Sequence, residues 1–188
     1  MSMESLLSAY LNQDYNIKVG YLWAIFLILQ IPIFFVGRKA SPSRDLLIEG
    51  SKYGGPLRAL EMAPDGAEYL FKHWDEETKT QLRRALYWDF LFIPLYVTSA
   101  VLACLMVGGY LRSAEIVRLG FVFSAPVGGL FDLVENLIML QVINGLTADH
   151  WLQIARVSTF CKFAFIGLAF TYGLCGLLSW PCVTYLHQ

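Results

Sequence analysis

Three polar residues, Asp132, Glu135 and Asn136, stand inside a long apolar run of the chain, residues 119–143. They are spaced at i, i+3 and i+4, so on a helix their side chains share one face. The run is long enough to cross a bilayer as a helix. A carboxylate within a transmembrane helix is costly unless it is paired, protonated or hydrated, so these residues indicate a functional site by default.

Polar side chains in the other apolar runs are expected at a similar depth. At a rise of about 1.5 Å per residue, Asp89 lies about 7–8 Å inside the cytoplasmic end of its helix, and Glu135 and Asn136 lie about 10–13 Å inside theirs. The remaining members of this predicted inner-leaflet cluster, besides Asp132, are Gln30, Tyr96 and Lys162. All four spans would therefore contribute to one ligand-binding or proton-carrying cluster.

Each of these residues also has a structural explanation. Lys162 either extends to the headgroups or forms a buried ion pair, for which Glu135 is the expected partner. Asp89 could reach interfacial water, and Asn136 could join two helices by a hydrogen bond worth about 0.6–2 kcal/mol. Asp132 is expected near the midplane, out of reach of water, so we expect it to be neutral at pH 7.

The chain lacks the sequence patterns of several common reaction centres. Its histidines all fall outside the apolar runs, which argues against haem or a histidine-bound metal in the membrane. It has no nucleophile elbow, P-loop or glycine-rich dinucleotide motif. Oxygen ligands from the cluster could hold a hard cation such as Mg²⁺ or Ca²⁺. Our expectation is nevertheless no metal, no cofactor and no nucleic-acid partner.

The elements that must position these residues follow from hydropathy. Of the 188 residues, 56% are hydrophobic, and the mean hydropathy is +0.51, which is too apolar for one soluble domain of this size. Four apolar blocks each meet the roughly 17–25 residues that a spanning helix needs. They are residues 19–37, 85–108, 119–143 and 157–180. The sequence therefore predicts an all-α polytopic membrane protein, a four-helix bundle.

The remaining segments are assigned around this single membrane domain, residues 19–188. Residues 1–18 are predicted to be an amphipathic lead-in at the outer surface. Residues 38–84 are predicted to form a small helical cytoplasmic segment, with one short helix beginning at Asp65. Asp75 is expected to cap a further helix that runs straight on into the second span.

The basic residues predict an orientation. Nine of the 14 Lys and Arg fall within residues 38–84, and few fall in the connection after the second span. The positive-inside rule then places that segment in the cytoplasm and both termini outside. Aromatic residues are expected to form belts at both interfaces, with Tyr87 and Trp151 among those at the inner one.

Prolines and small residues suggest how the spans pack. Pro32, Pro94 and Pro126 lie inside predicted spans, and each frees the carbonyl four residues earlier. For Pro94 that carbonyl belongs to Phe90, beside Asp89, so we interpret this kink as functional. Small residues at 124–129 would let another helix approach closely, with 167–171 and 169–173 as the expected counterparts.

Three segments of the chain resemble a loosely defined set of small bacterial four-span membrane proteins of unassigned function. They are RRALYWDFLFIPLY, with an aspartate early in span two, GGLFDLVENLIML, with a D-x-x-E-N motif in span three, and CKFAFIGLAF, with a lysine opening span four. The resemblance covers about residues 60–180 and implies a bacterial inner-membrane protein. Its matching positions are Asp89, Asp132, Glu135, Asn136 and Lys162. It implies no activity.

Three functional hypotheses remain open at this stage. The first is a binding or accessory protein whose inner-leaflet pocket holds a small ligand, a lipid or a partner's helix. The second is a small proton-coupled transporter, as a homodimer or within a larger complex, in which Asp132 or Glu135 changes protonation. The third, and least favoured, is a membrane enzyme that uses a carboxylate pair as general acid and base.

Overall fold

A computed structural model of the chain describes residues 3–40, 75–110, 115–145 and 149–185, with side chains described for 20–40, 75–107, 116–145 and 150–176. The described residues form four helices, α1 (Met3–Ala40), α5 (Glu76–Tyr110), α6 (Glu115–Ile143) and α7 (Asp149–Tyr185). Each is long and apolar enough to cross a membrane. The predicted all-α bundle of four spans is confirmed.

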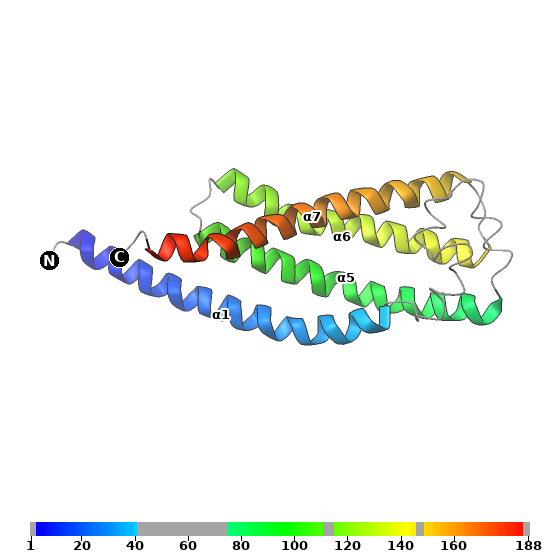
Figure 1. Cartoon of the computed structure of the whole chain (residues 1–188), viewed down its shortest axis with the longest axis horizontal. Coiled ribbons are helices and arrows are strands. Elements are labelled where there is room, and N and C mark those ends of the chain that lie inside the picture. The colour runs from blue at the N-terminus through cyan, green and yellow to red at the C-terminus, as the bar shows by residue number, and fades with distance from the viewer. Residues whose placement is uncertain (1–2, 41–74, 111–114, 146–148, 186–188) are drawn as a thin grey trace.

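The helices alternate in direction along one long axis (Figure 1). We call the end where α1 ends and α5 begins the loop end, and the opposite end the terminus end. The start of α1 and the end of α7 both lie at the terminus end. Helix α5 packs against the other three, and α6 packs most extensively against α7. Helix α1 packs chiefly against α5 and so forms one edge of the bundle.

All four helices extend beyond the predicted apolar runs, and the extension is informative for α1 and α5. Helix α1 is continuous from Met3, so the predicted lead-in joins the first span as one helix instead of forming a separate element. Helix α5 begins at Glu76 and runs through Pro94, as expected for the helix capped by Asp75. The rest of the predicted cytoplasmic segment, including the helix expected from Asp65, lies outside the described residues.

The cap of α5 has the geometry that the sequence suggests. Asp75 stands one residue before the helix, and its Oδ1 accepts the backbone N–H of Thr78 at 2.8 Å. Hydrogen bonds from Thr78 hold the pKa of Asp75 below its usual value, because they favour the ionised carboxylate. This contact fixes the first turn of the helix that later carries Asp89.

Neighbouring helices are in a regular antiparallel register. Gly37 of α1 lies against the ring of Phe92, and the Gln30 amide donates to the Ser99 hydroxyl at 2.9 Å. At the loop end, Arg83 Nε donates to Asn144 Oδ1 at 3.1 Å. With Gly37 level with Phe92, α1 ends close to the level of Asp89, while α5, α6 and α7 continue past it (Figure 1).

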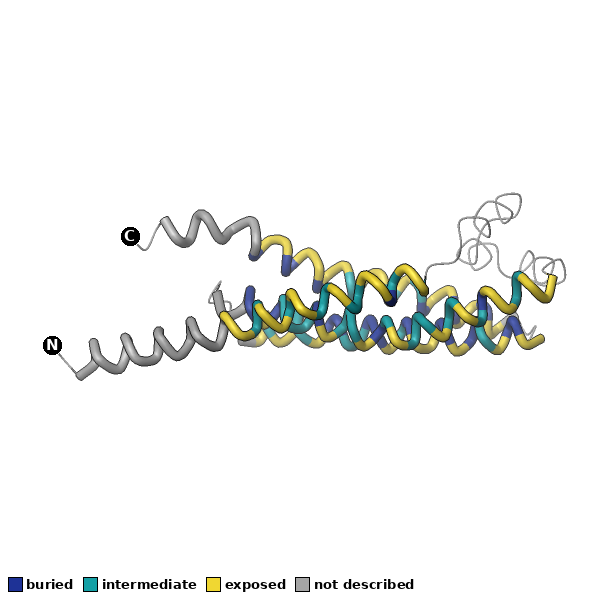
Figure 2. Tube along the Cα trace, turned by 90° about the horizontal axis from the view of Figure 1, so that it is seen from below, coloured by how far each residue is buried: buried dark blue, intermediate teal, exposed yellow. Residues whose placement is uncertain are grey.

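Buried apolar side chains form two separate layers. The loop-end layer consists of Ile138, Met139, Val142, Leu152 and Ala155, with Leu86 packed against it. The terminus-end layer consists of Cys104, Val107, Ala125, Ala169 and Tyr172. Outside these layers most residues of the helices are exposed (Figure 2). Many of the exposed residues are large and apolar, as expected where lipid surrounds a protein. Between the layers the buried side chains are largely polar.

The small residues of α6 do mark close helix contacts. A Cβ on Gly128 would lie 2.8 Å from the side chain of Ile166 on α7, and one on Gly129 would lie 2.5 Å from Val97 on α5. Of the predicted counterparts on α7, Ala169 is buried, whereas Gly167 is exposed and meets nothing within 4 Å. The 169–173 face thus packs inward, and the expected role of Gly167 is wrong.

Candidate functional site

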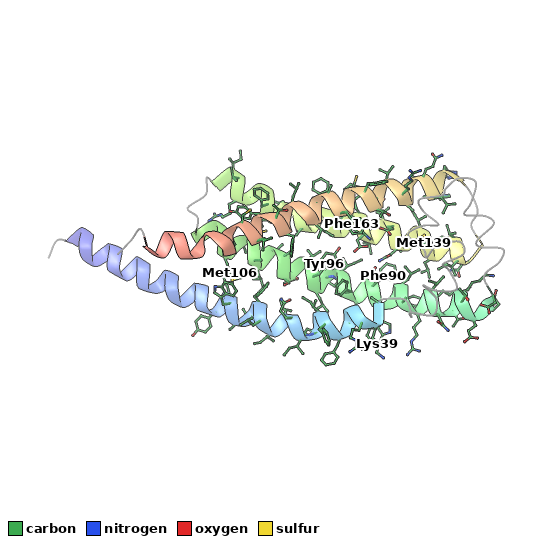
Figure 3. All side chains as sticks on the ribbon, viewed as in Figure 1. Lys39, Phe90, Tyr96, Met106, Met139 and Phe163 are labelled. Carbon is green, nitrogen blue, oxygen red and sulfur yellow. The ribbon has the colours of Figure 1, made fainter. Side chains whose placement is uncertain are left out.

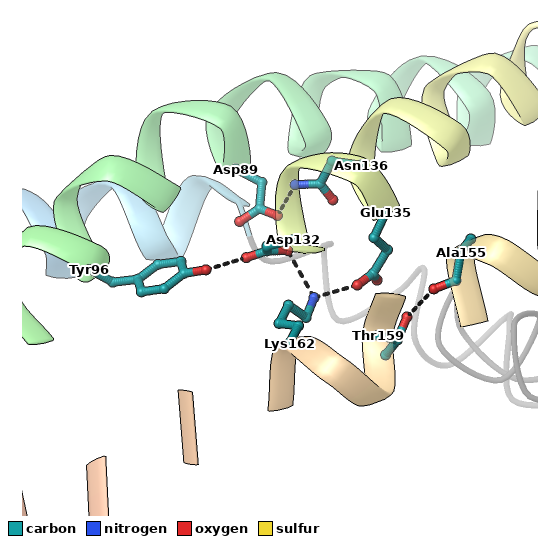
Figure 4. Close-up of polar contacts among 8 residues, drawn as sticks. All are labelled: Asp89, Tyr96, Asp132, Glu135, Asn136, Ala155, Thr159 and Lys162. Carbon is teal, nitrogen blue, oxygen red and sulfur yellow. Dashed lines mark hydrogen bonds and ion pairs between the residues drawn. The ribbon is translucent and has the colours of Figure 1, made fainter. Parts of the chain in front are cut away.

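The centre of the polar region is the ammonium of Lys162 on α7. Its Nζ lies 2.9 Å from Asp132 Oδ1 and 2.7 Å from Glu135 Oε2, both on α6 (Figure 4). The side chains are buried, with 13% of Lys162, 7% of Asp132 and 8% of Glu135 exposed. The predicted ion pair with Glu135 is confirmed, and Asp132 joins it. Lys162 does not extend to the surface.

The local sequence explains why one lysine reaches two carboxylates. Asp132 and Glu135 are three residues apart, so they lie on neighbouring turns of one face of α6. The contact of Gly128 with Ile166 brings α7 close to that face one turn away. Without a side chain at Gly128 the two backbones can approach, and the Lys162 side chain then fits between both acids.

The two ion pairs differ in their hydrogen bonding. Lys162 Nζ donates a hydrogen bond to Asp132 Oδ1 at 2.9 Å. Its contact with Glu135 Oε2 is short, but that oxygen is buried and has no partner at hydrogen-bonding angles among the described residues. Glu135 is therefore the less completely satisfied of the two acids.

Asp132 is held from a second side by Tyr96 of α5. The Tyr96 hydroxyl donates to Asp132 Oδ2 at 2.7 Å, so each carboxylate oxygen of Asp132 receives one donor. The expectation that Asp132 is neutral stays a prediction.

Asp89 forms a second connection between α5 and α6. Its Oδ2 accepts a hydrogen bond from Asn136 Nδ2 at 2.6 Å. Pro94 lies between Asp89 and Tyr96 in α5, so the two polar contacts to α6 flank the proline. The sequence predicts Asp89, Tyr96 and Asn136 in one cluster. In the structure Asp89 and Tyr96 of α5 both bond to residues of α6, because facing turns of antiparallel helices meet at this level.

Gln30 lies apart from this group. Its amide donates to the Phe26 carbonyl and to the Ser99 hydroxyl, both at 2.9 Å. Ser99 is one helical turn from Tyr96 toward the terminus end, so α1 contributes no side chain to the contacts around Lys162. The prediction that all four spans supply polar groups at one level is wrong for α1. Ser99 itself was missed, although its spacing of three from Tyr96 placed it on the same face.

A second residue missed from sequence is Thr159. Its hydroxyl donates to the Ala155 carbonyl at 2.9 Å, on the turn of α7 that precedes Lys162 (Figure 4). Threonine in a helix commonly donates to the carbonyl four residues earlier, so this contact could not have identified Thr159 as a site residue from the sequence.

Charge in the cluster is not balanced. Asp89, Asp132 and Glu135 contribute three carboxylates. Among the described residues, Lys162 is the one cation shown in contact with any of them, and it contacts Asp132 and Glu135. Fully ionised, these four groups carry a formal charge of −2. Burying uncompensated charge is costly. In a membrane, a bound proton, a bound cation or water must therefore offset the excess negative charge of the cluster.

Metal binding gains no direct support. Among the described residues, no three His, Cys, Asp or Glu side chains converge as possible ligands of one metal ion. Comparison of the chain with family models, curated proteins and solved structures finds no match. The bacterial set that three segments resemble is therefore not identified as a family, and the four-span architecture stands on the helices alone.

Proposed function

We propose that this four-span membrane protein takes up and releases a proton within its helix bundle, and that it uses this proton to drive transport. The observation that carries the proposal is the excess of buried carboxylates over the single lysine. A proton is the smallest ligand that removes such an excess, and ionisable groups inside a membrane domain commonly serve proton transfer.

Glu135 is the group that we expect to change protonation. It is buried, with 6% of the residue exposed, and its Oε2 depends on the Lys162 ammonium at 2.7 Å, which Asp132 shares. Asp132 already receives donors on both oxygens, and Asp89 is only partly buried, so water can stabilise its charge. Of the three acids, Glu135 therefore gains most from binding a proton.

The step itself is simple. Hydronium transfers a proton to one carboxylate oxygen of Glu135. An O–H bond forms on the carboxyl group, an O–H bond of the hydronium breaks and leaves water, and the charge of the cluster rises by one. Lys162 keeps its protons and its hydrogen bond to Asp132 Oδ1. One of the two ion pairs that join α6 to α7 is thereby lost. Protonation thus changes the attraction between these two helices, which is the coupling that a transporter requires.

The setting of this activity is part of the proposal. The distribution of Lys and Arg supports a loop end in the cytoplasm and both termini outside. The resemblance of three segments supports a bacterial inner membrane. A homodimer is expected, since four helices rarely enclose a complete pathway.

The same excess charge supports a second candidate, a binding protein for a small cationic ligand or lipid headgroup. Such a ligand would occupy the place of the proton near Glu135 and Asp89. The two candidates differ in the state of the acids. A proton converts a carboxylate to a carboxylic acid, whereas a cationic ligand leaves the carboxylate ionised.

Infrared difference spectroscopy of the protein in lipid nanodiscs tests both candidates. We expect a carboxylic-acid band that appears on acidification, is absent from the Glu135→Gln variant and persists in Glu77→Gln, a matched change at an exposed glutamate of α5. Liposomes under a pH gradient should show proton flux that Glu135→Gln abolishes. A wild-type spectrum without the acid band across pH 5–8 would exclude the proton proposal.

A further inference from the structure

The path from the cluster to water differs in length toward the two ends. Toward the loop end, Glu135 lies nine residues from Asn144, which is exposed and bonded to Arg83. At about 1.5 Å per residue this is about 13–14 Å of helix. Toward the terminus end, Asp132 lies fourteen residues from Arg118, or about 21 Å on the same rise. The loop-end path is the shorter.

Packing in the terminus-end layer is tight. The rings of Phe121 and Tyr172 stack with centroids 4.2 Å apart and planes at 4°. Cys104 and Ala125 are fully buried, each with 0% exposed. Gly176 lies directly against Val107, so α5 and α7 touch backbone to side chain there. Stacked rings and close backbones leave few ways for this layer to open.

Both layers are built from side chains of α5, α6 and α7, but fewer of the described helices run past the loop-end layer. Of the described helices, only α5, α6 and α7 reach its level, because α1 ends near Asp89 (Figure 3). In Figure 3 Met139 lies beyond Lys39 and Phe90 along the long axis, whereas Met106 lies far toward the terminus end. Met139 is also unbranched and adaptable, so it can change rotamer without disturbing the backbone.

Charged residues indicate that water surrounds the loop-end layer. Arg38 and Lys39 are exposed at the end of α1, and Arg156 is exposed on α7 beside the buried Ala155. Exposed basic side chains at these positions mark the edge of the hydrocarbon. That edge then lies near the level of Asp89, and Asp132, four residues from Asn136, is only about 6 Å inside it.

We propose that, in the conformation described above, the cluster exchanges its proton with water at the loop end, through transient opening of the loop-end layer, while the terminus-end layer stays closed. Transport of the proton then requires a second conformation in which the terminus-end layer opens. The charged groups that face Glu135 in this state are Lys162 of α7 and Asp132 on its own helix. The identity of the exchanging species rests on the proposed function. The position of the opening does not.

Cysteine labelling tests the position of the opening. Cys104 is a natural free thiol in the terminus-end layer, and Met139→Cys places a second thiol in the loop-end layer. Cys161, Cys175 and Cys182 are changed to serine, and the protein is held in nanodiscs, where both faces meet the reagent. A membrane-impermeant methanethiosulfonate is added, and labelling of the two thiols in the same molecule is followed by mass spectrometry.

We expect the thiol of Met139→Cys to react at least roughly tenfold faster than Cys104, since local opening sets the rate. Equal rates, a faster Cys104, or no labelling of either thiol would each overturn the proposal. If Met139→Cys lowers the thermal midpoint too far to be used, Ala155→Cys reports on the same layer from α7. Labelling does not depend on protonation of Glu135, so its result stands whether or not the infrared acid band is found.

A kinetic measurement adds a readout at the cluster itself. Met139→Ala should speed the infrared response of Glu135 to a pH jump several-fold, because it opens space in the loop-end layer. Met106→Ala removes a side chain buried to a similar degree near the terminus end and should leave the rate unchanged. Acceleration by Met106→Ala and not by Met139→Ala would place the opening at the other end.

Discussion

Two helix pairs in this molecule pack side by side in different ways. Between α6 and α7, a lysine and two carboxylates are buried together, and glycine brings the backbones close. Between α1 and α5, the polar contact is the neutral hydrogen bond from Gln30 to Ser99. In a membrane both pairs gain from packing, but only the charged pair becomes costly when one partner is removed. The comparison thus distinguishes the α1–α5 pair, which is held by packing and a neutral hydrogen bond, from the α6–α7 pair, in which each helix carries charges that the other must neutralise.

The largest expected effect comes from removing the shared cation. Lys162→Met should lower the free energy of unfolding by about 3–5 kcal/mol, because it leaves buried carboxylates without a partner. The double change with Glu135→Gln should be more stable than Lys162→Met alone. Thermal midpoints in mild detergent provide the measurement. If the stability changes of the two single variants simply add in the double variant, Lys162 and Glu135 are not coupled. The charged contact would then no longer distinguish α6 and α7 from α1 and α5.

Removing one acid at a time sharpens the comparison within the charged pair. Asp132→Asn should cost about 1–3 kcal/mol more than Glu135→Gln, because Asp132 accepts hydrogen bonds from both Tyr96 and Lys162, whereas Glu135 Oε2 contacts the shared Lys162 ammonium. Denaturation of the two variants beside Glu77→Gln gives the difference. The opposite order would mean that Asp132 is the neutral acid after all.

The neutral pair should show a smaller coupling. In a double-mutant cycle, Gln30→Leu and Ser99→Ala should be coupled by about 0.6–1.7 kcal/mol, the range of hydrogen bonds between membrane helices. The measurement is the same thermal unfolding in detergent. A coupling as large as that between Lys162 and Glu135 would remove the distinction between the two helix pairs.

The smallest effect is expected outside both pairs, at the exposed cap of α5. Asp75 has its pKa lowered in the folded protein from the ordinary 3.8, so its stabilising contribution is present above that pH and is lost as the pH falls through the lower folded-state value. Asp75→Ala should therefore reduce the thermal midpoint slightly at neutral pH and have no effect in strong acid. A penalty that persisted in strong acid would point to a role other than capping.

Much of the architecture could be predicted because each step depends on local sequence. Hydropathy defines the four spans, and the i, i+3, i+4 spacing puts Asp132, Glu135 and Asn136 on one face. The pairing of Lys162 with Glu135 followed from their depths in antiparallel neighbours. Each of these steps needs only helix geometry and the order of the spans.

The predictions for Gln30 and Gly167 were wrong because they required knowledge of which helices pack against each other. Gln30 has a depth that sequence supplies, but α1 packs chiefly on α5 and faces Ser99 instead of the cluster. Gly167 has the expected spacing, but it is exposed, and the opposite face of α7 packs inward. Rotation of a helix about its axis and its choice of neighbour depend on packing of the whole bundle, which periodicity does not encode.

The shared lysine also bears on how the chain enters its membrane during synthesis. A charged side chain at the centre of an inserting helix costs about 2.5–3.5 kcal/mol, and α6 carries two acids while α7 carries a base. Only residues 144–148 separate the two helices, and Gly145 among them has a left-handed backbone conformation at φ 106°. If α6 and α7 insert together as a hairpin, opposite charges meet before either is exposed to lipid. A nascent chain truncated after α6 should therefore integrate poorly, and a chain that extends through α7 should integrate well.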